Sequence, residues 1–409
     1  MSQAYLPSIE SRTSWLVTAV ALIVMAIAFG GPYIAIVALK EIAAESGGAR
    51  SVPSLAAALA WFGTAVGGVL MGHVANRFGM RLTAVFGGAM IAIGLTLATF
   101  GAGWPLYLGY GLFVGIFGLG AINAPLYVYV SHWFDRHRGS ALALISSGGY
   151  LAGALWPPIF QKLVAYAGWR QTMLWYAAFS VATIVPLAAL MLRKPPAQPH
   201  HDAAPSAAAP VRSVLGWPPN LVFAMMAGAA FMCCVTMSMP QGHLVAFCSD
   251  LGIAPGHGAM MLSLLLGSAF LSRQIWGVIS DRIGGLNTVL LGSACQAVTL
   301  SGFLLTQDEY GLFAISAAFG LGFAGLIPAY VLALRELYPA SEAYWRIPTL
   351  LLCSGTGMGA GNWLAGVIYD HFGYYAPSFI TGIAFNVLNF IVVAMLVVQQ
   401  RQHRRLAMA

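Results

Sequence analysis

The chain consists of a series of apolar runs of about twenty residues, each followed by a short polar segment. A helix of that length spans the hydrocarbon core of a bilayer. Because the runs are continuously apolar and do not alternate with polar positions, they predict helices and not the strands of a barrel. We therefore expect an all-α membrane protein with twelve transmembrane helices, near residues 14–38, 54–75, 82–101, 104–131, 139–164, 170–192, 218–245, 257–280, 286–305, 310–335, 346–369 and 375–398.

One segment interrupts this pattern near the middle of the chain. Residues 193–213, RKPPAQPHHDAAPSAAAPVRS, are rich in proline and alanine and have no apolar period. Such a composition is typical of a flexible linker. It predicts an N-terminal six-helix bundle at 1–192, a cytoplasmic linker at 193–217 and a C-terminal six-helix bundle at 218–409.

Two short motifs recur at one spacing along the chain. GHVANRFGMR, which begins at Gly72, returns as GVISDRIGGL, which begins at Gly277, and Gly168 has a counterpart in Gly373. Both pairs are offset by 205 residues, since 277 − 72 = 205 and 373 − 168 = 205. A duplicated six-helix unit leaves such an offset. We therefore expect two pseudo-symmetric bundles.

Composition and charge agree with a membrane protein. Hydrophobic residues make up 59% of the chain and charged residues 8%, which does not suit a soluble domain. Of the nineteen lysines and arginines, fourteen fall on the side of the predicted termini and four on the opposite side, with Arg273 inside a span. The positive-inside rule then predicts that both termini lie in the cytoplasm. The net charge of +7 thus indicates orientation and not nucleic acid.

Residues that would indicate other functions are sparse. The five cysteines have no CxxC spacing, and no His pair accompanies them, so the sequence predicts neither a disulfide framework nor a metal site, and no cofactor. No Asp or Glu falls inside a predicted span and the His residues are scattered, so the spans offer no carboxylate pair or metal cluster and we do not expect an enzyme. The first apolar run is too long for a signal peptide and is read as a retained span. We expect a monomer.

The repeated motif resembles the signature loop of the major facilitator superfamily, Gly-x-x-x-Asp-Arg-x-Gly-Arg-Arg/Lys, and the resemblance covers nearly the whole chain. It implies the fold of that family and predicts loops that act as conformational latches. The first copy has Asn76 where the family has Asp, which puts a charge-dependent latch there in doubt, and ordinary positive-inside turns are the alternative. The predicted loop residues are Gly72, Asn76, Arg77, Gly79 and Arg81 in the first copy, and Gly277, Asp281 and Arg282 in the second.

A second resemblance concerns the turn and span that begin at residue 132. The sequence HWFDRHRGSA, followed by Ser-Gly and Pro-Pro, is similar to bacterial relatives of the monocarboxylate transporters and of the oxalate/formate exchangers. The bacterial inner membrane that we expect for the chain follows from this resemblance. In that group an arginine of the eighth span holds the substrate carboxylate, and Arg273 falls on its position. From the residues alone, Arg273 needs a bound anion, water or carbonyls at a helix break as a partner. Snorkelling to the interface, or pairing with Asp281, are the alternatives.

Further polar side chains inside the predicted spans are candidates for the binding site. A tyrosine hydroxyl or an asparagine amide can donate a hydrogen bond in a dry cavity. Anchoring at the membrane interface or helix packing would explain each of them too. His243 is a candidate for proton coupling, with interface packing as the alternative. The substrate-binding candidates beside Arg273 are Tyr127, Asn123, Tyr33, Tyr330 and Asn362.

A single buried cation favours a substrate with a single carboxylate, because a dianion would keep an uncompensated charge. The oxalate exchangers carry a lysine in span eleven that is missing from residues 351–363, and Ala269 stands where animal-type carriers have an aspartate. We therefore predict transport of monocarboxylates such as lactate or pyruvate by alternating access, through proton symport or anion exchange. An oxalate/formate-type exchanger and an exporter of other amphipathic compounds are the alternatives.

Overall fold

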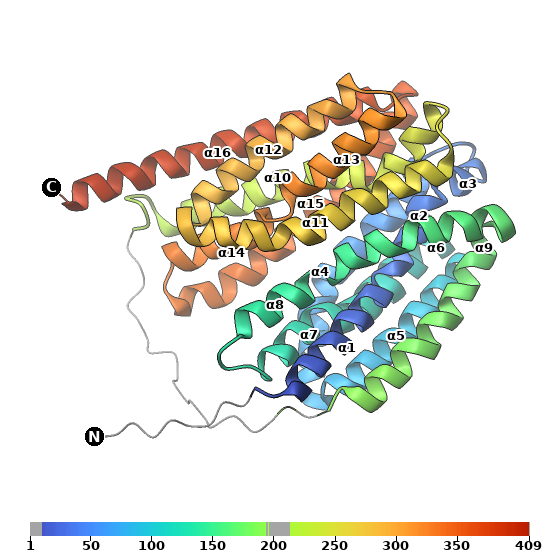
Figure 1. Ribbon diagram of the computed structural model, residues 1–409, viewed down its shortest axis with the longest axis horizontal. Coiled ribbons are helices and arrows are strands. Elements are labelled where there is room, and N and C mark those ends of the chain that lie inside the picture. The colour runs from blue at the N-terminus through green and yellow to red at the C-terminus, as the bar shows by residue number, and fades with distance from the viewer. Residues whose placement is uncertain (1–9, 194, 196–212, 409) are drawn as a thin grey trace.

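The computed structural model describes residues 10–193, 195 and 213–408. Its ribbon forms two groups of long helices that lie side by side (Figure 1). We call α1 to α9 the N-terminal half and α10 to α16 the C-terminal half. The predicted linker at 193–217 falls largely outside the described residues, and the predicted division of the chain into three parts remains a prediction.

The N-terminal half consists of helices broken at glycines and prolines. Helices α1 and α2 are separated at Phe29, and the Gly30-Gly31-Pro32 sequence forms the first turn of α2. Span four contains a π-helix, η1, before α7. The elements are α1 (Arg12–Ala28), α2 (Gly30–Val37), α3 (Leu39–Ala44), α4 (Ser51–Phe78), α5 (Met80–Ala98), α6 (Trp104–Leu108), η1 (Gly109–Leu119), α7 (Gly120–Ser131), α8 (Arg138–Ser146) and α9 (Gly148–Met191).

The C-terminal half has longer uninterrupted helices. Its span ten is divided at Ala324 and Gly325 into two helices, and its last helix runs well beyond the predicted end of the twelfth span. The elements are α10 (Pro219–Asp250), α11 (Pro255–Ile283), α12 (Gly285–Leu305), α13 (Glu309–Phe323), α14 (Leu326–Leu337), α15 (Ala340–Phe372) and α16 (Ala376–Met408).

Ten helical stretches of the described residues are long and apolar enough to cross a membrane. One of them, Gly139–Met191, has 53 residues and contains a reversal at Gly168, where φ is 79° and ψ is 166°. At ~1.5 Å per residue that stretch is far too long for one span, so it holds two. The polar, glycine-rich α15 adds a further span of 33 residues. Ten plus one plus one gives the twelve spans that the sequence predicts.

The backbone repeats with the predicted offset of 205 residues. Gly79 and Gly284 both follow a long helix, with φ of 86° and 81° and ψ of 156° and 163°. The next helix begins in the same way in both halves, since Thr83 donates to the Gly79 carbonyl and Thr288 to the Gly284 carbonyl. A left-handed φ of this kind favours glycine. The two halves are therefore pseudo-symmetric in backbone as well as in sequence.

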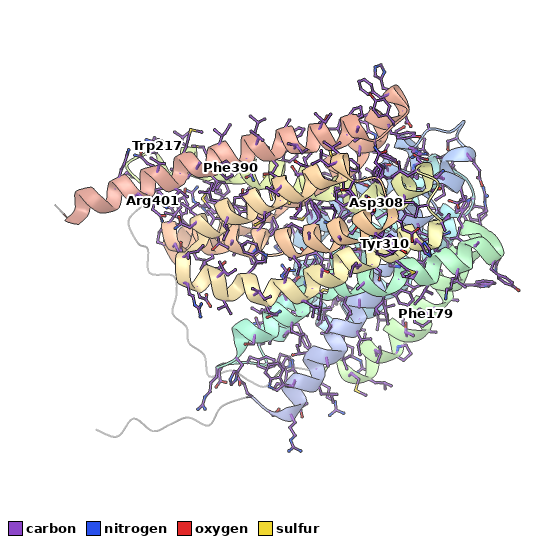
Figure 2. All side chains as sticks on the ribbon, turned by 45° about the horizontal axis from the view of Figure 1, so that its top comes forward. Phe179, Trp217, Asp308, Tyr310, Phe390 and Arg401 are labelled. Carbon is purple, nitrogen blue, oxygen red and sulfur yellow. The ribbon has the colours of Figure 1, made fainter. Side chains whose placement is uncertain are left out.

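The outer faces of the helices carry large apolar side chains, which suits contact with lipid. Phe179 and Phe390 are 41% and 36% exposed and point away from the bundle (Figure 2). Arg401 lies at the end of the molecule where α1 begins and α16 ends, and Asp308 lies at the opposite end (Figure 2). We call these ends the terminal face and the distal face.

The two halves meet along two helix pairs, α4 with α15 and α9 with α11. Small residues permit the close approach in the first pair, since a Cβ at Gly359 would lie 2.8 Å from the Ala58 carbonyl oxygen. In the second pair, Ser263 of α11 donates to the Ala154 carbonyl of α9. Such contacts between small residues are the usual means by which membrane helices associate.

Candidate functional site

Arg273 lies in α11 and reaches across to the other half. Its Nη1 donates to the carbonyl oxygen of Ser146 over 2.9 Å, and its guanidinium lies 5.1 Å from the centroid of the Tyr150 ring. Ser146 is the last residue of α8, and α9 begins at Gly148. Carbonyls at such a break have lost their helical partners and can accept from a cation. A carbonyl at a helix break is one of the partners expected for Arg273 from the sequence.

Three tyrosines surround this break. The hydroxyls of Tyr127 and Tyr150 lie within electrostatic range of the Arg273 guanidinium. The hydroxyl of Tyr33 donates to the Gly149 carbonyl over 3.4 Å. The structure thus brings Arg273, Tyr127 and Tyr33 into one region, where the N-terminal helices α2, α7 and α9 face α11. Tyr150 is an addition that the sequence analysis missed, although it stands in the Ser-Gly-Gly-Tyr sequence.

A small cavity lies between the halves on the distal side of this region. Its volume is about 20 Å³, which is room for one water molecule and not for an organic anion. Tyr33 and Asn362 both line it. Gln241 also lines it, and the Nε2 atom of Gln241 and the Oδ1 atom of Asn362 are buried without a hydrogen-bond partner. In the described conformation the two halves therefore leave no room for an organic anion at this cavity. The unpaired polar atoms of Gln241 and Asn362 lie between the halves.

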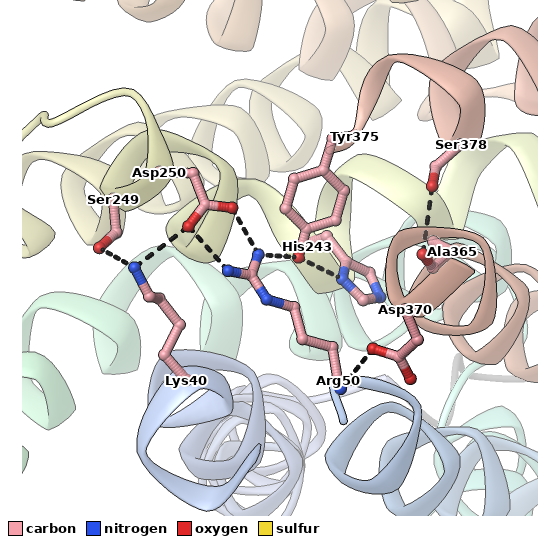
Figure 3. A network of polar contacts seen from close by, with 9 residues as sticks. All are labelled: Lys40, Arg50, His243, Ser249, Asp250, Ala365, Asp370, Tyr375 and Ser378. Carbon is pink, nitrogen blue, oxygen red and sulfur yellow. Dashed lines mark hydrogen bonds and ion pairs between the residues drawn. The ribbon is translucent and has the colours of Figure 1, made fainter. Parts of the chain in front are cut away.

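The distal face is held shut by ion pairs that cross between the halves (Figure 3). Both terminal nitrogens of Arg50, just before α4, bond the Asp250 carboxylate of α10 over 2.6 and 2.7 Å. Lys40 of α3 reaches the same carboxylate over 3.1 Å. The Arg50 side chain is 7% exposed, and the Lys40 side chain 42%. The pair with Arg50 is therefore the shielded one and contributes more to closure than the exposed pair with Lys40.

Two further groups of the C-terminal half converge on Arg50. The Asp370 carboxylate accepts from the backbone nitrogens of Arg50 and Ser51 over 2.7 and 3.0 Å, and the Tyr369 ring lies 3.6 Å from the guanidinium carbon. Tyr375 accepts from Arg50 Nη1 over 2.8 Å. Burial works against the charge of Arg50, but the hydrogen bonds of its guanidinium to Asp250 and Tyr375 outweigh it and hold the pKa of Arg50 above its ordinary value.

His243 is fully buried within the same cluster. Its Nδ1 lies 3.0 Å from the Tyr375 hydroxyl (Figure 3). Its Nε2 lies 2.8 Å from the Asn362 carbonyl oxygen and 3.3 Å from Ser54 Oγ. Asn362 in turn donates from Nδ2 to the Ser54 carbonyl of the other half. The structure thus joins His243 and Asn362 at the distal side of the cavity, on α10 and α15.

Two substrate-binding candidates remain, Tyr330 and Asn123, and the structure places Tyr330 inside the C-terminal half. The Tyr330 hydroxyl bonds Asn389 Oδ1 over 2.5 Å inside the C-terminal half, where Asn389 also bonds Ser293. Asn123 is half-buried on α7, one helical turn before Tyr127. Tyr330 therefore belongs to a polar cluster among α12, α14 and α16, and its predicted role in binding remains a prediction.

The predicted conformational loops lie where α4 and α11 end on the terminal face. Asn76, Arg77 and Arg81 are exposed in the first, and Asp281 and Arg282 in the second. In the second loop, the Glu336 carboxylate of α14 accepts from the Gly285 nitrogen and caps α12. A carboxylate at a helix N-terminus is favourable. Glu336 was not predicted, because nothing in the sequence indicates that its side chain lies next to this loop.

The described residues contain no group of three or more His, Cys, Asp or Glu side chains that could hold a metal ion.

The sequence model of the Major Facilitator Superfamily matches residues 21–307 and 226–407. The chain is 28% identical to monocarboxylate transporter 13 of Bos taurus over 337 residues, which is 82% of this chain and 76% of the relative. It is 23% identical over 328 residues to the MFS-type transporter pynF of Aspergillus niger, covering 78% and 74%. Among solved structures, the nucleoside transporter NupG superposes with a TM-score of 0.70 at 13% identity, covering 95% of this chain and 100% of that one.

Proposed function

The chain belongs to the Major Facilitator Superfamily, and we propose that this transporter carries small organic anions, most favourably monocarboxylates such as lactate or pyruvate, by alternating access. The observation that supports this proposal is the position of Arg273 between the halves. Its guanidinium has five N–H donors, and among the described residues it makes one hydrogen bond, to a backbone carbonyl. The remaining donors are available for a carboxylate, which arginine binds in bidentate geometry.

The number of available cations supports a substrate with one carboxylate. Arg50 and Arg346 are also buried, but each is already paired, Arg50 with Asp250 and Arg346 with Glu342. Arg273 therefore remains as the cation that can meet a substrate between the halves. A dianion on Arg273 alone would keep an uncompensated charge in a region of low dielectric constant. Tyr127 and Tyr33 beside Arg273 are proposed to orient the substrate, with Asn123, Tyr330 and Asn362 as further candidates.

The transport cycle follows from which face is closed. With Arg50 bonded to Asp250, the distal face is shut, and we propose that substrate exchanges with the terminal face in this conformation. The charge asymmetry of the loops supports an orientation with the terminal face in the cytoplasm, and we propose the bacterial inner membrane as the location. In the opposite conformation the loops at residues 72–81 and 277–286 would approach one another. His243 is the proposed proton-coupling residue, and either proton symport or anion exchange would drive transport.

The similarity to monocarboxylate transporter 13 supports this substrate class, since that relative is named for it. The test is uptake of labelled lactate, pyruvate, formate and oxalate into proteoliposomes, with and without a pH gradient or preloaded anion. We expect lactate and pyruvate to enter faster than oxalate. Absence of flux for every carboxylate would refute the proposal.

Substitution of Arg273 tests the site itself. We expect Arg273→Ala to lower carboxylate flux at least about a hundredfold, because a charge-assisted bidentate contact is lost, and Arg273→Lys to restore only part of it. Arg401→Ala, which removes an exposed charge on the terminal face, is the control and should transport at the wild-type rate. If Arg273→Ala transports normally and is folded, the arginine has a structural role only.

A further inference from the structure

A directed chain of hydrogen bonds links Arg50 of the N-terminal half to His243 of the C-terminal half through Tyr375 (Figure 3). A carbonyl oxygen can only accept, so the 2.8 Å contact with the Asn362 carbonyl requires a proton on His243 Nε2. In a neutral ring Nδ1 is then the acceptor, and the Tyr375 hydroxyl donates to it over 3.0 Å. The oxygen of Tyr375 is thus free to accept from Arg50 Nη1 over 2.8 Å.

This arrangement is complete only when His243 is neutral. The charged groups around the ring are Arg50 before α4, Lys40 on α3, Asp250 on α10 and Asp370 on α15, two cations and two anions. The titratable tyrosines that face it are Tyr369 on α15 and Tyr375 before α16. With a neutral imidazole the formal charges of the cluster cancel, and all the groups that connect Arg50 to His243 are paired. Burial makes any departure from this balance costly.

A second proton on His243 would disrupt the chain at Tyr375. Nδ1–H and Arg50 Nη1–H would both point at one hydroxyl oxygen, and the hydrogen of that hydroxyl would lose its acceptor. Two cations would then face one another across a single oxygen atom. The cluster would also carry an uncompensated positive charge. Arg50 would be pushed away from Tyr375 and toward separation from the C-terminal half.

We infer that Tyr375 is a positioning residue that makes closure of the distal face depend on a neutral His243. Acid then favours a conformation in which the distal face is open. The inference rests on the alternating access of the proposed function, but not on the identity of the substrate. Tyr375 lies outside the predicted substrate site. Its role is to couple the protonation of His243 to the ion pairs of Arg50.

The test measures the opening of the distal face directly, without substrate. Spin labels at Glu41→Cys and Tyr310→Cys would report the distance between the two halves on this face, since both side chains are exposed and lie in different halves. The background carries Cys295→Ser and Cys353→Ser, and the other three cysteines are buried. We expect the population with the longer distance to rise at least about fivefold as the pH falls from about 7.5 to about 5.5, the range in which histidine titrates.

Substitutions show which residues the pH-dependent opening of the distal face requires. His243→Gln, which keeps a donor and an acceptor but cannot gain a proton, should stay closed at both pH values. Tyr375→Phe should lose most of the pH response, whereas Tyr374→Phe, at the exposed neighbouring tyrosine, should keep it. If Tyr375→Phe does not fold, Arg50→Gln interrupts the same chain at its other end and should likewise abolish the response.

Each contrary result has a definite meaning. A pH response that survives in His243→Gln, or a wild-type distance that does not change with pH, overturns the inference. A response that is lost in His243→Gln but intact in both Tyr375→Phe and Arg50→Gln overturns the role of Tyr375. Failure of the proposed substrate class would appear as absent carboxylate flux with the pH-dependent distances unchanged, so the two proposals can be separated.

Discussion

Three arginines among the described residues are buried or half-buried, and their partners distinguish their roles. Arg346 is enclosed by Glu342, Asn220 and aromatic rings within one half. Arg50 is paired with Asp250 across the two halves. Arg273 has a backbone carbonyl and a tyrosine ring, and no acidic partner among the described residues. All three residues are arginines, but Arg50 and Arg346 are each paired with a carboxylate. Because Arg273 has no carboxylate partner among the described residues, its charge is available to bind an anion.

The pattern of the sequence identified Arg273 because its charge falls within an apolar run. It did not identify Arg50, since Arg50 stands in a short polar loop where a charge is ordinary. The partners of Arg50 are 200 and 320 residues away along the chain, at Asp250 and Asp370. Only the packing of the two halves brings these groups together. A single sequence does not show which residues so far apart along the chain lie close together in space.

An exposed ion pair in the loops of the distal face permits a pH prediction. Glu45 accepts from Nη1 and Nη2 of Arg170 over 2.5 and 2.6 Å and from Nε1 of Trp169 over 3.0 Å. The hydrogen bond to Arg170, opposed by partial burial, lowers the pKa of Glu45 below its ordinary value of 4.5. The carboxylate therefore stabilises the folded state above about pH 4.5, and this contribution is lost as the pH falls toward the lower folded pKa.

Because Arg170 and Glu45 are 45% and 34% exposed, we expect the contribution to be below about 1 kcal/mol. Thermal unfolding of the wild type and of Glu45→Gln at about pH 7 and about pH 3.5 would measure it. The wild type should be the more stable at the higher pH, and the difference should shrink at the lower one. Glu41→Gln, at an exposed glutamate of α3, should unfold with wild-type pH dependence. An equal loss for Glu45→Gln at both pH values would contradict this explanation.

At the scale of the elements, the sequence predicted the spans well and their interruptions in part. The Gly-Gly-Pro sequence lies in the first turn of α2, directly after the break between α1 and α2, and the repeated glycines predicted the turns at Gly79 and Gly284. The π-helix η1 was not predicted. The break after α8 lies at Ser147, in the serine- and glycine-rich part of the fifth span, but its contact with Arg273 depends on the packing of the two halves and could not be predicted from the sequence.

Helix α4 offers a prediction about packing, since its glycines have different surroundings. A Cβ at Gly67 would collide with the backbone of Ile116 in η1, whereas at Gly72 it would meet nothing within 4 Å. We expect Gly67→Ala to lower the free energy of unfolding by about 1–3 kcal/mol because backbone has to move. Gly72→Ala should be neutral or stabilise by up to about 1 kcal/mol, since alanine favours helix over glycine.

The measurement is the unfolding transition of both variants in the same detergent, with helix content from circular dichroism as the control for folding. The comparison is matched because both residues lie in one helix and the substitution is identical. Equal stability of the two variants would show that α4 and η1 do not approach as closely as described.

At the scale of the whole molecule, the duplication explains why the sequence was informative. A unit that appears twice leaves two sets of turns at one offset, and the structure repeats the conformation of Gly79 at Gly284. Gly168 and Gly373 share a positive φ of 79° and 80° but differ in ψ, which is 166° and 2°.

The two halves also differ in their polar side chains. Arg273 lies in the second half, 205 residues after Gly68 in the sequence, so its counterpart in the first half has no side chain. The substrate site is therefore expected to be asymmetric although the fold is nearly symmetric.

The orientation in the membrane follows from the same arrangement and can be tested on cells. Tyr310 is 86% exposed on the distal face, and Arg401 is exposed on the terminal face (Figure 2). If the positive-inside rule holds, a membrane-impermeant maleimide should label Tyr310→Cys in intact cells and Arg401→Cys only after the membrane is opened. The parent chain, whose cysteines are buried or half-buried, sets the background. The reverse pattern would place the Arg50 cluster in the cytoplasm. The conformation described here would then be closed on the cytoplasmic side, and acid at the cytoplasmic face would be the condition that opens the Arg50 cluster.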